Sequence, residues 1–280
     1  MSANTSHMER EFPMSQRDFE HIKQVAYELT GIKLTDHKKN MIYSRLARRI
    51  RRRQLGSFRD YCDLISADGS DEITDFINAI TTNLTSFFRE EHHFDFLVQN
   101  VFPELLRHNQ GSRRIRIWSA GCSTGEEPYS IAMCLREKMP VESWDIRVLA
   151  TDLDTDVVAH GKRGVYSADR IDGIVEDRKK RWFLRDSVGE EVRVKDSLRN
   201  LITFKPLNLL QSWPMRGPFD VIFCRNVVIY FDKDTQRTLF DRYADLLAPG
   251  GYLFIGHSES LHKVTNRFVS RGRTIYQKVG

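Results

Sequence analysis

Apolar residues recur every three or four positions over the first 80 residues, which is the spacing of one face of a helix. Three such stripes are Phe19, Ile22, Ala26 and Leu29, then Ile42, Leu46 and Ile50, then Ile73, Phe76, Ile77 and Ile80. Ser15-x-x-Asp18 and Ser57-x-x-Asp60 both fit a capping box ahead of a helix. The pattern predicts an N-terminal helical bundle over residues 15–80, with the second helix starting near Thr35 or Asp36.

The polar run TTNLTS (81–86) interrupts this pattern with side chains that prefer caps and turns. We therefore predict a linker over residues 81–93 between two domains. A further helix is expected from about residue 91 to residue 108.

Short β-rich runs then alternate with helical segments, at 115–120, 146–151, 201–205, 219–224, 252–256 and 274–279. Such alternation predicts a mostly parallel sheet with crossover helices, so residues 94–280 are expected to form a doubly wound, Rossmann-like α/β domain. Residues 167–200 are rich in charge, and 192–195 alternate like an exposed antiparallel strand. We predict a small inserted antiparallel β-subdomain there.

The composition agrees with two domains, since 280 residues with 40% hydrophobic side chains can build an α/β core and a smaller unit. No apolar run approaches the roughly 18 residues that span a bilayer, and residues 1–13 do not resemble a signal peptide. We expect a soluble, cytoplasmic protein. The four cysteines have no partners at metal-ligand or disulfide-framework spacing, so we expect reduced thiols and no metal.

The net charge of +5 conceals a cluster of six arginines between residues 45 and 53. Four of them, Arg45, Arg48, Arg49 and Arg52, are three, four and seven positions apart and share one side of the second predicted helix. Arginines so close together repel one another, and an acidic partner would relieve that repulsion, although many charge runs are only solvated surface. The charge itself is compatible with either a protein or a nucleic-acid partner.

Glycines follow the first predicted strand in the segment GCSTGEEPY (121–129), where they allow a sharp turn and close approach of a ligand to the backbone. The second strand ends at Asp152, 31 positions after Gly121, where a carboxylate could accept hydrogen bonds from ribose hydroxyls. This combination suggests a nucleoside-containing cofactor. The alternative is a structural tight turn with a surface aspartate.

The same glycine segment matches G-x-S-x-G, the nucleophile elbow of α/β-hydrolases, and His257 lies downstream as a Ser–Asp–His triad would need. An elbow normally follows several strands, however, whereas everything before Ile115 is predicted to be helical. Hydrolysis would also leave Asp152 unexplained.

Polar residues follow the fourth predicted strand in FCRNVVIYF (223–231), at the edge of an open α/β sheet where ligands bind. Arg225, Asn226 and Tyr230 should face the same crevice as Asp152, joined by Asn208 after the third strand. The alternative role for either asparagine is a cap or turn.

Four segments taken together resemble the signature blocks of the CheR family of chemotaxis receptor methyltransferases: TTNLTSFFRE (81–90), STGEEPYS (123–130), TDLD (151–154) and FCRNVVIYF (223–231). The similarity runs from about Ser15 to the C-terminus. It implies a class I methyltransferase domain that uses S-adenosylmethionine (AdoMet) to convert receptor glutamates to methyl esters. It also implies recruitment to membrane-bound receptor arrays, where a coiled coil bearing Glu and Gln would meet the basic N-terminal helix.

The resemblance also implies roles for individual residues. Those expected to contact AdoMet or its product, S-adenosylhomocysteine, are Asn83, Thr85, Arg89, Glu127, Asp152, Asn208, Leu209, Arg225 and Asn226. Arg89 and Tyr230 would lie nearest the reacting groups. The loop 186–191 is shorter than in members that dock on a receptor's C-terminal pentapeptide, which argues against such tethering here.

Two other functions are compatible with parts of the sequence. A nucleic-acid methyltransferase would suit the basic charge, but enzymes that methylate amino groups usually carry Asn or Asp followed by Pro-Pro and an aromatic residue, whereas Asn226 is followed by two valines. A binding module that senses AdoMet without turnover is the other possibility. The presence of both Arg89 and Tyr230 argues against it.

Overall fold

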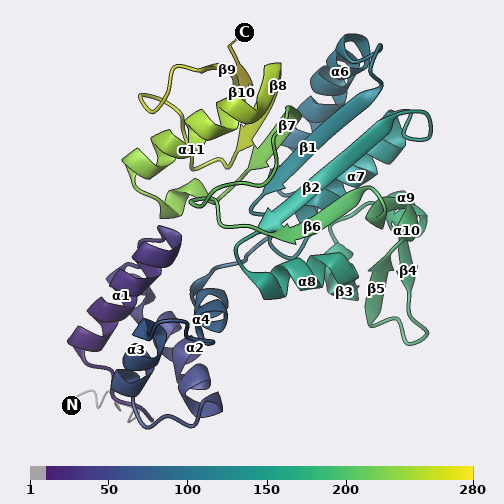
Figure 1. Cartoon of the computed structure of the whole chain (residues 1–280). Coiled ribbons are helices and arrows are strands. Elements are labelled where there is room, and N and C mark those ends of the chain that lie inside the picture. The colour runs from purple at the N-terminus through teal and green to yellow at the C-terminus, as the bar shows by residue number, and fades with distance from the viewer. Residues whose placement is uncertain (1–10, 280) are drawn as a thin grey trace, which may run out of the picture. The chain divides into compact units, whose positions relative to one another are not determined.

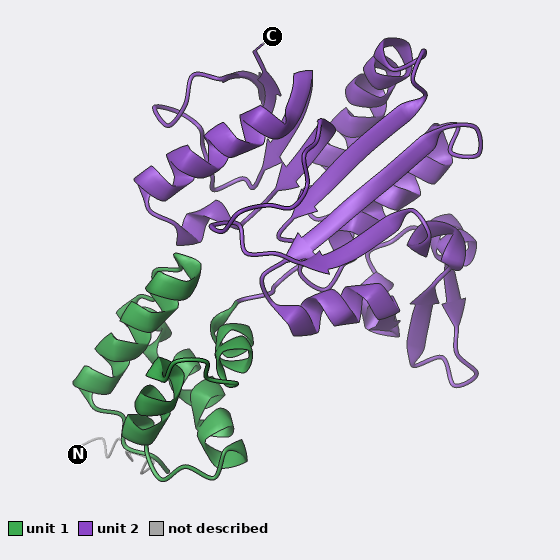
Figure 2. Cartoon of the chain, viewed as in Figure 1, with its two compact units in different colours: residues 1–81 green, residues 82–280 purple. Residues whose placement is uncertain are grey.

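The computed structural model describes residues 11–279 (Figure 1). The chain divides into two compact units, residues 1–81 and 82–280 (Figure 2). Each unit has its own hydrophobic core. Among the described residues, no helix is both long enough and apolar enough to cross a bilayer.

The first unit is helical, as predicted. It consists of α1 (Gln16–Thr30), the 3-10 turn η1 (Asp36–Lys38), α2 (Lys39–Arg52), α3 (Phe58–Ser66) and α4 (Ile73–Ile80). The predicted capping box is complete at the start of α1, where Ser15 and Asp18 exchange side-chain and backbone hydrogen bonds. The predicted apolar stripes of α1, α2 and α4 pack into one core together with Phe58 and Tyr61 of α3.

The second unit contains a seven-stranded sheet in the order β6-β2-β1-β7-β8-β10-β9 (Figure 1). The strands are β1 (Arg114–Ala120), β2 (Asp145–Asp152), β6 (Ile202–Pro206), β7 (Phe219–Cys224), β8 (Leu247–Ile255), β9 (Phe268–Gly272) and β10 (Ile275–Lys278). The first five in this order are parallel, while β10 pairs antiparallel with both β8 and β9. The predicted fold class is confirmed, although β9 was not predicted from the sequence.

Both faces of the sheet are covered, so its central strands are apolar on both sides. On one face, Ile117 and Phe223 pack against α7 (Glu126–Lys138) and against a helical segment that precedes β1. On the other face, Trp118 and Ile222 pack against α11 (Lys233–Leu246). Because β1, β2, β6 and β7 are parallel, their carboxyl ends lie at the same edge of the sheet.

The helix predicted over residues 91–108 has three parts: α5 (His92–Phe96), a π-helical turn η2 (Leu97–Val101) and α6 (Phe102–His108). Pro103 lies at the start of α6. Because proline lacks an N–H group, a regular α-helical bond is lost there, and the π turn accommodates the irregularity.

A small antiparallel sheet, β3-β5-β4, lies in the predicted insertion. The segment consists of β3 (Val165–Ser167), η3 (Ala168–Ile171), α9 (Glu176–Trp182), β4 (Phe183–Arg185), β5 (Glu191–Val194) and α10 (Asp196–Arg199), and it follows α8 (Thr155–Arg163). The antiparallel strand expected over 192–195 corresponds to β5, whose side chains alternate between exposed and buried positions. β5 is central, and Val192 and Val194 are fully buried because a sheet with one packed face turns alternate side chains inward.

Candidate active site

The turn after β1 brings the backbone close to its neighbours. Gly121 and Gly125 have φ values of +94° and +101°, which are left-handed conformations that favour glycine. A Cβ atom at Gly121 would lie 2.3 Å from Val227 Cγ2, and one at Gly125 would lie 2.9 Å from the backbone of Gly161. Both glycines are therefore required by close packing as well as by backbone conformation.

Asp152 lies at the end of β2 beside this turn. Its Oδ2 accepts a hydrogen bond from Ser123 N at 2.8 Å, and its Oδ1 accepts one from Asp154 N at 3.1 Å. Burial raises the pKa of Asp152 to about 6. Because each carboxylate oxygen can accept more than one hydrogen bond, both can also accept bonds from vicinal ribose hydroxyls. The donor and acceptor set thus fits the predicted nucleoside.

The segment 83–88 is fastened to the same edge of the sheet. Asn83 Nδ2 donates to Asp154 at 2.7 Å, and the Asn83 carbonyl accepts from Ser123 Oγ at 2.9 Å. Arg170 donates to the Thr85 carbonyl at 2.8 Å. The predicted cofactor residues Asn83 and Thr85 are therefore brought next to the glycine turn and to Asp152.

Arg225, from the end of β7, is a buried cation with a side chain only 3% exposed. It donates to the backbone carbonyl of Arg89, and it lies 3.3 Å from Glu127 and 3.5 Å from Glu90. Glu127 also accepts from Ser119 Oγ at 2.7 Å, and burial raises the pKa of Glu127. Arg225 therefore connects α7 with the segment that carries Arg89. Its buried guanidinium holds these two parts of the candidate site together.

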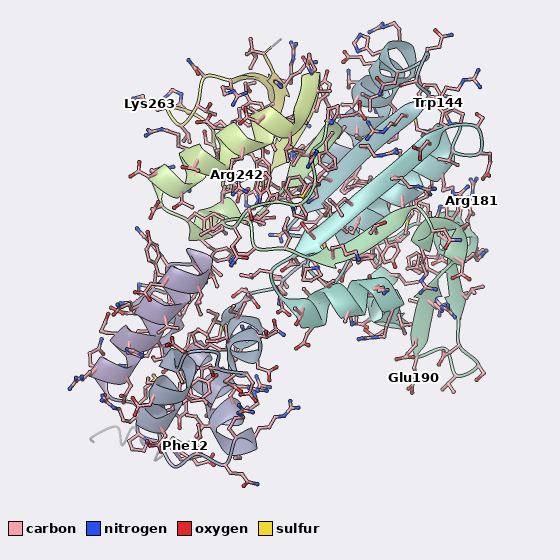
Figure 3. All side chains as sticks on the ribbon, viewed as in Figure 1. Phe12, Trp144, Arg181, Glu190, Arg242 and Lys263 are labelled. Carbon is pink, nitrogen blue, oxygen red and sulfur yellow. The ribbon has the colours of Figure 1, made fainter. Side chains whose placement is uncertain are left out.

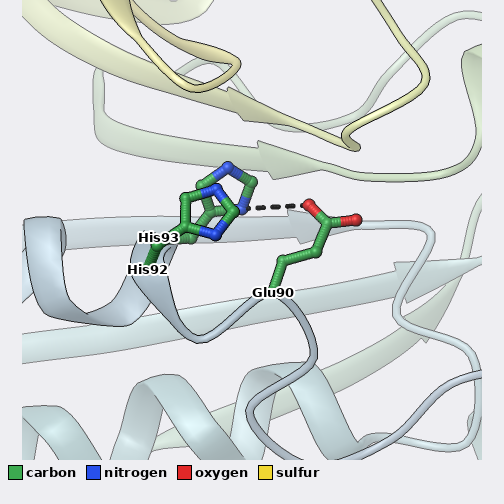
Figure 4. Close-up of side chains that lie close together, drawn as sticks. All are labelled: Glu90, His92 and His93. Atoms are coloured by element: carbon green, nitrogen blue, oxygen red, sulfur yellow. Dashed lines mark ion pairs between the residues drawn. The ribbon is translucent and has the colours of Figure 1, made fainter.

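Glu90, His92 and His93 each place a potential metal ligand within 4.8 Å of the others (Figure 4). Glu90 Oε2 lies 3.4 Å from His93 Nδ1, and the same oxygen lies 3.5 Å from Arg225. The other oxygen of Glu90 lies 2.9 Å from His257 Nδ1. The buried guanidinium already supplies positive charge at Glu90 and would repel a second cation. We therefore interpret these side chains as a polar network around Arg225.

Tyr230 and Asn226 lie on the loop after β7. Asn226 has a left-handed φ of +58°, and Tyr230 lies in the 3-10 turn η4 (Val228–Tyr230). Burial raises the pKa of the Tyr230 hydroxyl. Tyr230 is therefore protonated at neutral pH and can donate a hydrogen bond.

Asn208 and Leu209 follow β6. Asn208 Oδ1 accepts from Leu210 N at 2.9 Å, which is the turn geometry that the sequence left open as its alternative role. Leu209 is buried, and its carbonyl accepts from Arg242 at 2.7 Å. Arg242, labelled in Figure 3, extends from α11 with its guanidinium 3.7 Å from the centroid of the Trp213 ring. The loop after β6 is thus held in place beside Asp152.

The hydrolase alternative is not supported by the geometry. Ser123 Oγ donates to the Asn83 carbonyl, while His257 pairs with Glu90. Neither partner is the one that a catalytic triad needs, because the serine must bond to its histidine base.

Two of the four arginines predicted to meet a partner are occupied within the first unit. Arg45 donates to the carbonyls of Ala79 and Thr81, at the end of α4. Arg49 makes two hydrogen bonds to fully buried Glu72, at 2.7 and 2.8 Å, and also pairs with Asp75. Repulsion among these arginines is therefore relieved in part by carboxylates of the chain itself, which reduces the need for an acidic partner.

Arg48 and Arg52 remain exposed on α2, with no ion pair or side-chain hydrogen bond to any described residue. Arg48 and Arg52 are therefore the two members of the predicted four-arginine surface that remain available to a partner.

Sequence reasoning did not identify several residues that shape the site. Asp154 caps α8 through the backbone N–H groups of Asp156 and Val157, and it also holds Asn83. Glu90 and Arg170 were also missed. Asp154 and Glu90 lie inside motifs that the sequence had singled out, whereas Arg170 is 44 positions from its partner Glu126 and carries no local signal.

Comparison with known proteins identifies the family to which this chain belongs. Residues 17–81 match the family described as "CheR methyltransferase, all-alpha domain", and residues 83–277 match "CheR methyltransferase, SAM binding domain". The chain is 43% identical over 270 residues to Chemotaxis protein methyltransferase 2 of Pseudomonas aeruginosa, with 95% of each chain covered. It is 42% identical over 273 residues to the Chemotaxis protein methyltransferase of Escherichia coli, covering 96% of this chain and 93% of that protein.

Proposed function

Because the chain belongs to the CheR methyltransferase family, whose matching domain binds AdoMet, we propose that it transfers the methyl group of AdoMet to glutamate side chains of chemotaxis receptors. The observation that carries this proposal is the match to relatives named chemotaxis protein methyltransferases over nearly the whole chain. The substrate class comes from those names. The arrangement of Asp152, Arg89 and Tyr230 supports the chemistry.

The acceptor in this reaction needs no general base. A glutamate has a reference pKa of about 4.3 and is ionised at neutral pH. AdoMet supplies a methyl group on a positively charged sulfur, so the carboxylate oxygen can displace it directly. The enzyme's task is to remove water from the carboxylate and to align it.

Arg89 is suited to align a carboxylate. One guanidinium nitrogen, Nη1, donates to the Leu84 carbonyl at 2.8 Å, and its backbone carbonyl is held by Arg225. Its other guanidinium N–H groups bond to no described residue and can form charge-assisted hydrogen bonds to an incoming carboxylate. Protonated Tyr230 can supply one more donor.

The exposed arginines of α2 support an acidic partner. We infer that Arg48 and Arg52 meet the acidic face of a receptor helix and recruit the enzyme to membrane-bound receptor arrays. Attraction between exposed charges chiefly speeds association and selects partners.

The deciding experiment uses radiolabelled AdoMet with receptor-containing membranes, followed by alkali. Label released as volatile methanol identifies a carboxyl methyl ester, whereas an N-methyl product keeps its label. A receptor fragment with alanine at its methylation sites is the matched control and should stay unlabelled. Alkali-stable label, or label transferred to DNA instead, would contradict the proposal.

A further inference from the structure

A buried glutamate that the sequence did not single out lies behind the loop that carries Asn226 and Tyr230. Glu259 is 5% exposed and belongs to the turn that follows β8. Its Oε2 accepts hydrogen bonds from Gly256 N at 2.6 Å and from Asn226 N at 3.0 Å. Its Oε1 faces Ile229 N at 3.3 Å. One carboxylate thus joins the carboxyl ends of β7 and β8.

The loop has little internal support. Asn226 is held in a left-handed conformation, and the described loop backbone closes only two 3-10 bonds, from Tyr230 N to Val227 O at 3.2 Å and from Phe231 N to Val228 O at 3.1 Å. A Cβ atom at Gly256 would lie 2.8 Å from the backbone nitrogen of Asn226, so the two backbones are already in close contact. Such a loop needs outside partners to hold one conformation.

A second buried side chain holds the loop from its other end. Gln236 of α11 is 8% exposed and donates from Nε2 to the carbonyls of Val228 and Phe231, at 2.8 and 3.1 Å. Glu259 therefore satisfies N–H groups of the loop, while Gln236 satisfies its carbonyl groups. Neither type of group could stay buried and unpaired without a cost of about 1–3 kcal/mol.

The carboxylate of Glu259 is bound by different groups from those that bind Glu90 and Glu127. Those two carboxylates share Arg225, whereas Glu259 forms no ion pair with any described residue and is bound by backbone N–H groups. Backbone dipoles that converge on a carboxylate fix its position and that of the chain segments that donate.

We propose that Glu259 is a positioning residue for methyl transfer, which sets the loop 226–231 so that Asn226 reaches the cofactor and Tyr230 reaches the reacting carboxylate. The inference rests on the proposed function, because the roles of Asn226 and Tyr230 come from it. Glu259 itself touches neither cofactor nor substrate. Its effect passes through the backbone of the loop.

The substitution Glu259→Gln tests this at almost constant volume. Two N–H donors converge on the single oxygen Oε2, and a third faces Oε1. An amide has only one oxygen, so its NH2 group would face at least one N–H donor. Glu104→Gln is the matched control, because Glu104 accepts from the Tyr252 hydroxyl at 2.8 Å and an amide oxygen can do the same.

The experiment measures methylation of a receptor cytoplasmic fragment by the full chain, together with affinity for S-adenosylhomocysteine. For Glu259→Gln we expect kcat to fall about 10- to 100-fold while KM for the receptor changes less than about twofold. A 3-fluorotyrosine placed at position 230 should show a shifted or broadened fluorine resonance. Glu104→Gln should match the wild type in kcat, affinity and fluorine signal.

Gln236→Ala keeps the proposal testable if Glu259→Gln does not fold. It removes the opposite support of the same loop and should lower kcat and disturb the fluorine signal in the same direction. Wild-type kcat per folded molecule with an unchanged fluorine resonance, in whichever variant folds, would overturn the proposal even if the melting temperature fell. If the wild type labels no receptor carboxylate, the proposed function fails, and the product affinity and the fluorine signal then decide the role of Glu259.

Discussion

The Asp152 carboxylate has the orientation and the hydrogen-bonding capacity expected of a group that binds a nucleoside. Its two oxygens each accept one backbone N–H bond, which orients the carboxylate and leaves acceptor capacity for ribose hydroxyls. Asp152→Ala should weaken AdoMet binding by about 1.5–3 kcal/mol, or roughly 10- to 100-fold in Kd. Calorimetry measures this directly. Asp145→Asn, at the opposite end of β2 and exposed, should leave Kd unchanged.

The raised pKa of Asp152 also predicts a pH dependence. Below about pH 6 the buried carboxyl is protonated in the free protein, and binding to ribose hydroxyls favours its ionised form. AdoMet affinity should therefore fall as pH drops below about 6, with proton release on binding in that range. Calorimetry in buffers of different ionisation enthalpy measures the released protons. Asp152→Asn should abolish this release, and an unchanged release in that variant would assign it to another group.

Arg89 is expected to act on turnover more than on cofactor affinity. Among the described residues its side chain bonds only to the Leu84 carbonyl, so most of its donors remain for the substrate carboxylate. Arg89→Ala should lower kcat about 100-fold or more while AdoMet Kd changes by less than about tenfold. Arg271→Ala, an exposed arginine on β9 bonded to Gln277, serves as the control. A large loss of melting temperature with full activity in the folded fraction would instead make Arg89 a structural residue.

At the scale of an element, α2 carries two kinds of arginine: some bond within the first unit, and others remain exposed to a partner. Arg49 is 12% exposed and is the main partner of Glu72, which is fully buried. Arg49→Met would leave that carboxylate with half-exposed Arg53 as its remaining cation among the described residues, beside the Tyr61 hydroxyl, so the first unit should lose about 3 kcal/mol of unfolding free energy. Urea unfolding measures the loss. Arg48→Met on the same helix should change stability by less than about 0.5 kcal/mol.

The exposed arginines of α2, Arg48 and Arg52, should control binding of the receptor. Reversing Arg48 and Arg52 together to Glu should sharply reduce receptor methylation, because the acidic helix would be repelled. AdoMet binding should be unaffected, since the predicted cofactor residues all belong to the second unit. The measurement compares kcat/KM for receptor with AdoMet Kd in the same variant. Equal losses in both would show a general defect rather than a partner surface.

At the scale of the whole molecule, the nature of the partner can be tested by competition. Exposed charges are screened over about 8 Å at physiological salt, so receptor methylation should weaken as ionic strength rises. A nucleic-acid enzyme would show the same trend. Receptor cytoplasmic fragment should therefore be compared with duplex DNA at equal charge as a competitor. We expect only the receptor fragment to compete, and competition by DNA alone would reverse the assignment of a protein substrate.

The fold class could be predicted from the sequence, and so could the edge of the sheet where the predicted cofactor residues lie. Apolar stripes at helical spacing predicted the first unit, and β-rich runs between helices predicted the parallel sheet. Polar residues at strand ends, such as Asp152 and Asn226, then had to share one edge, because parallel strands end together. These are local periodicities and connections, which a single chain displays directly.

The sequence could not show which charged side chains bond within the protein and which remain exposed. Arg45 and Arg49 have the same spacing as Arg48 and Arg52, but within the described part of the chain α4 and its preceding turn bring partners only to the first pair. Glu259 and Arg225 likewise gain their roles from segments at least 30 residues away. The physical reason is that the role of a buried polar group depends on its hydrogen-bonding partner. Long-range packing determines which partner lies within reach.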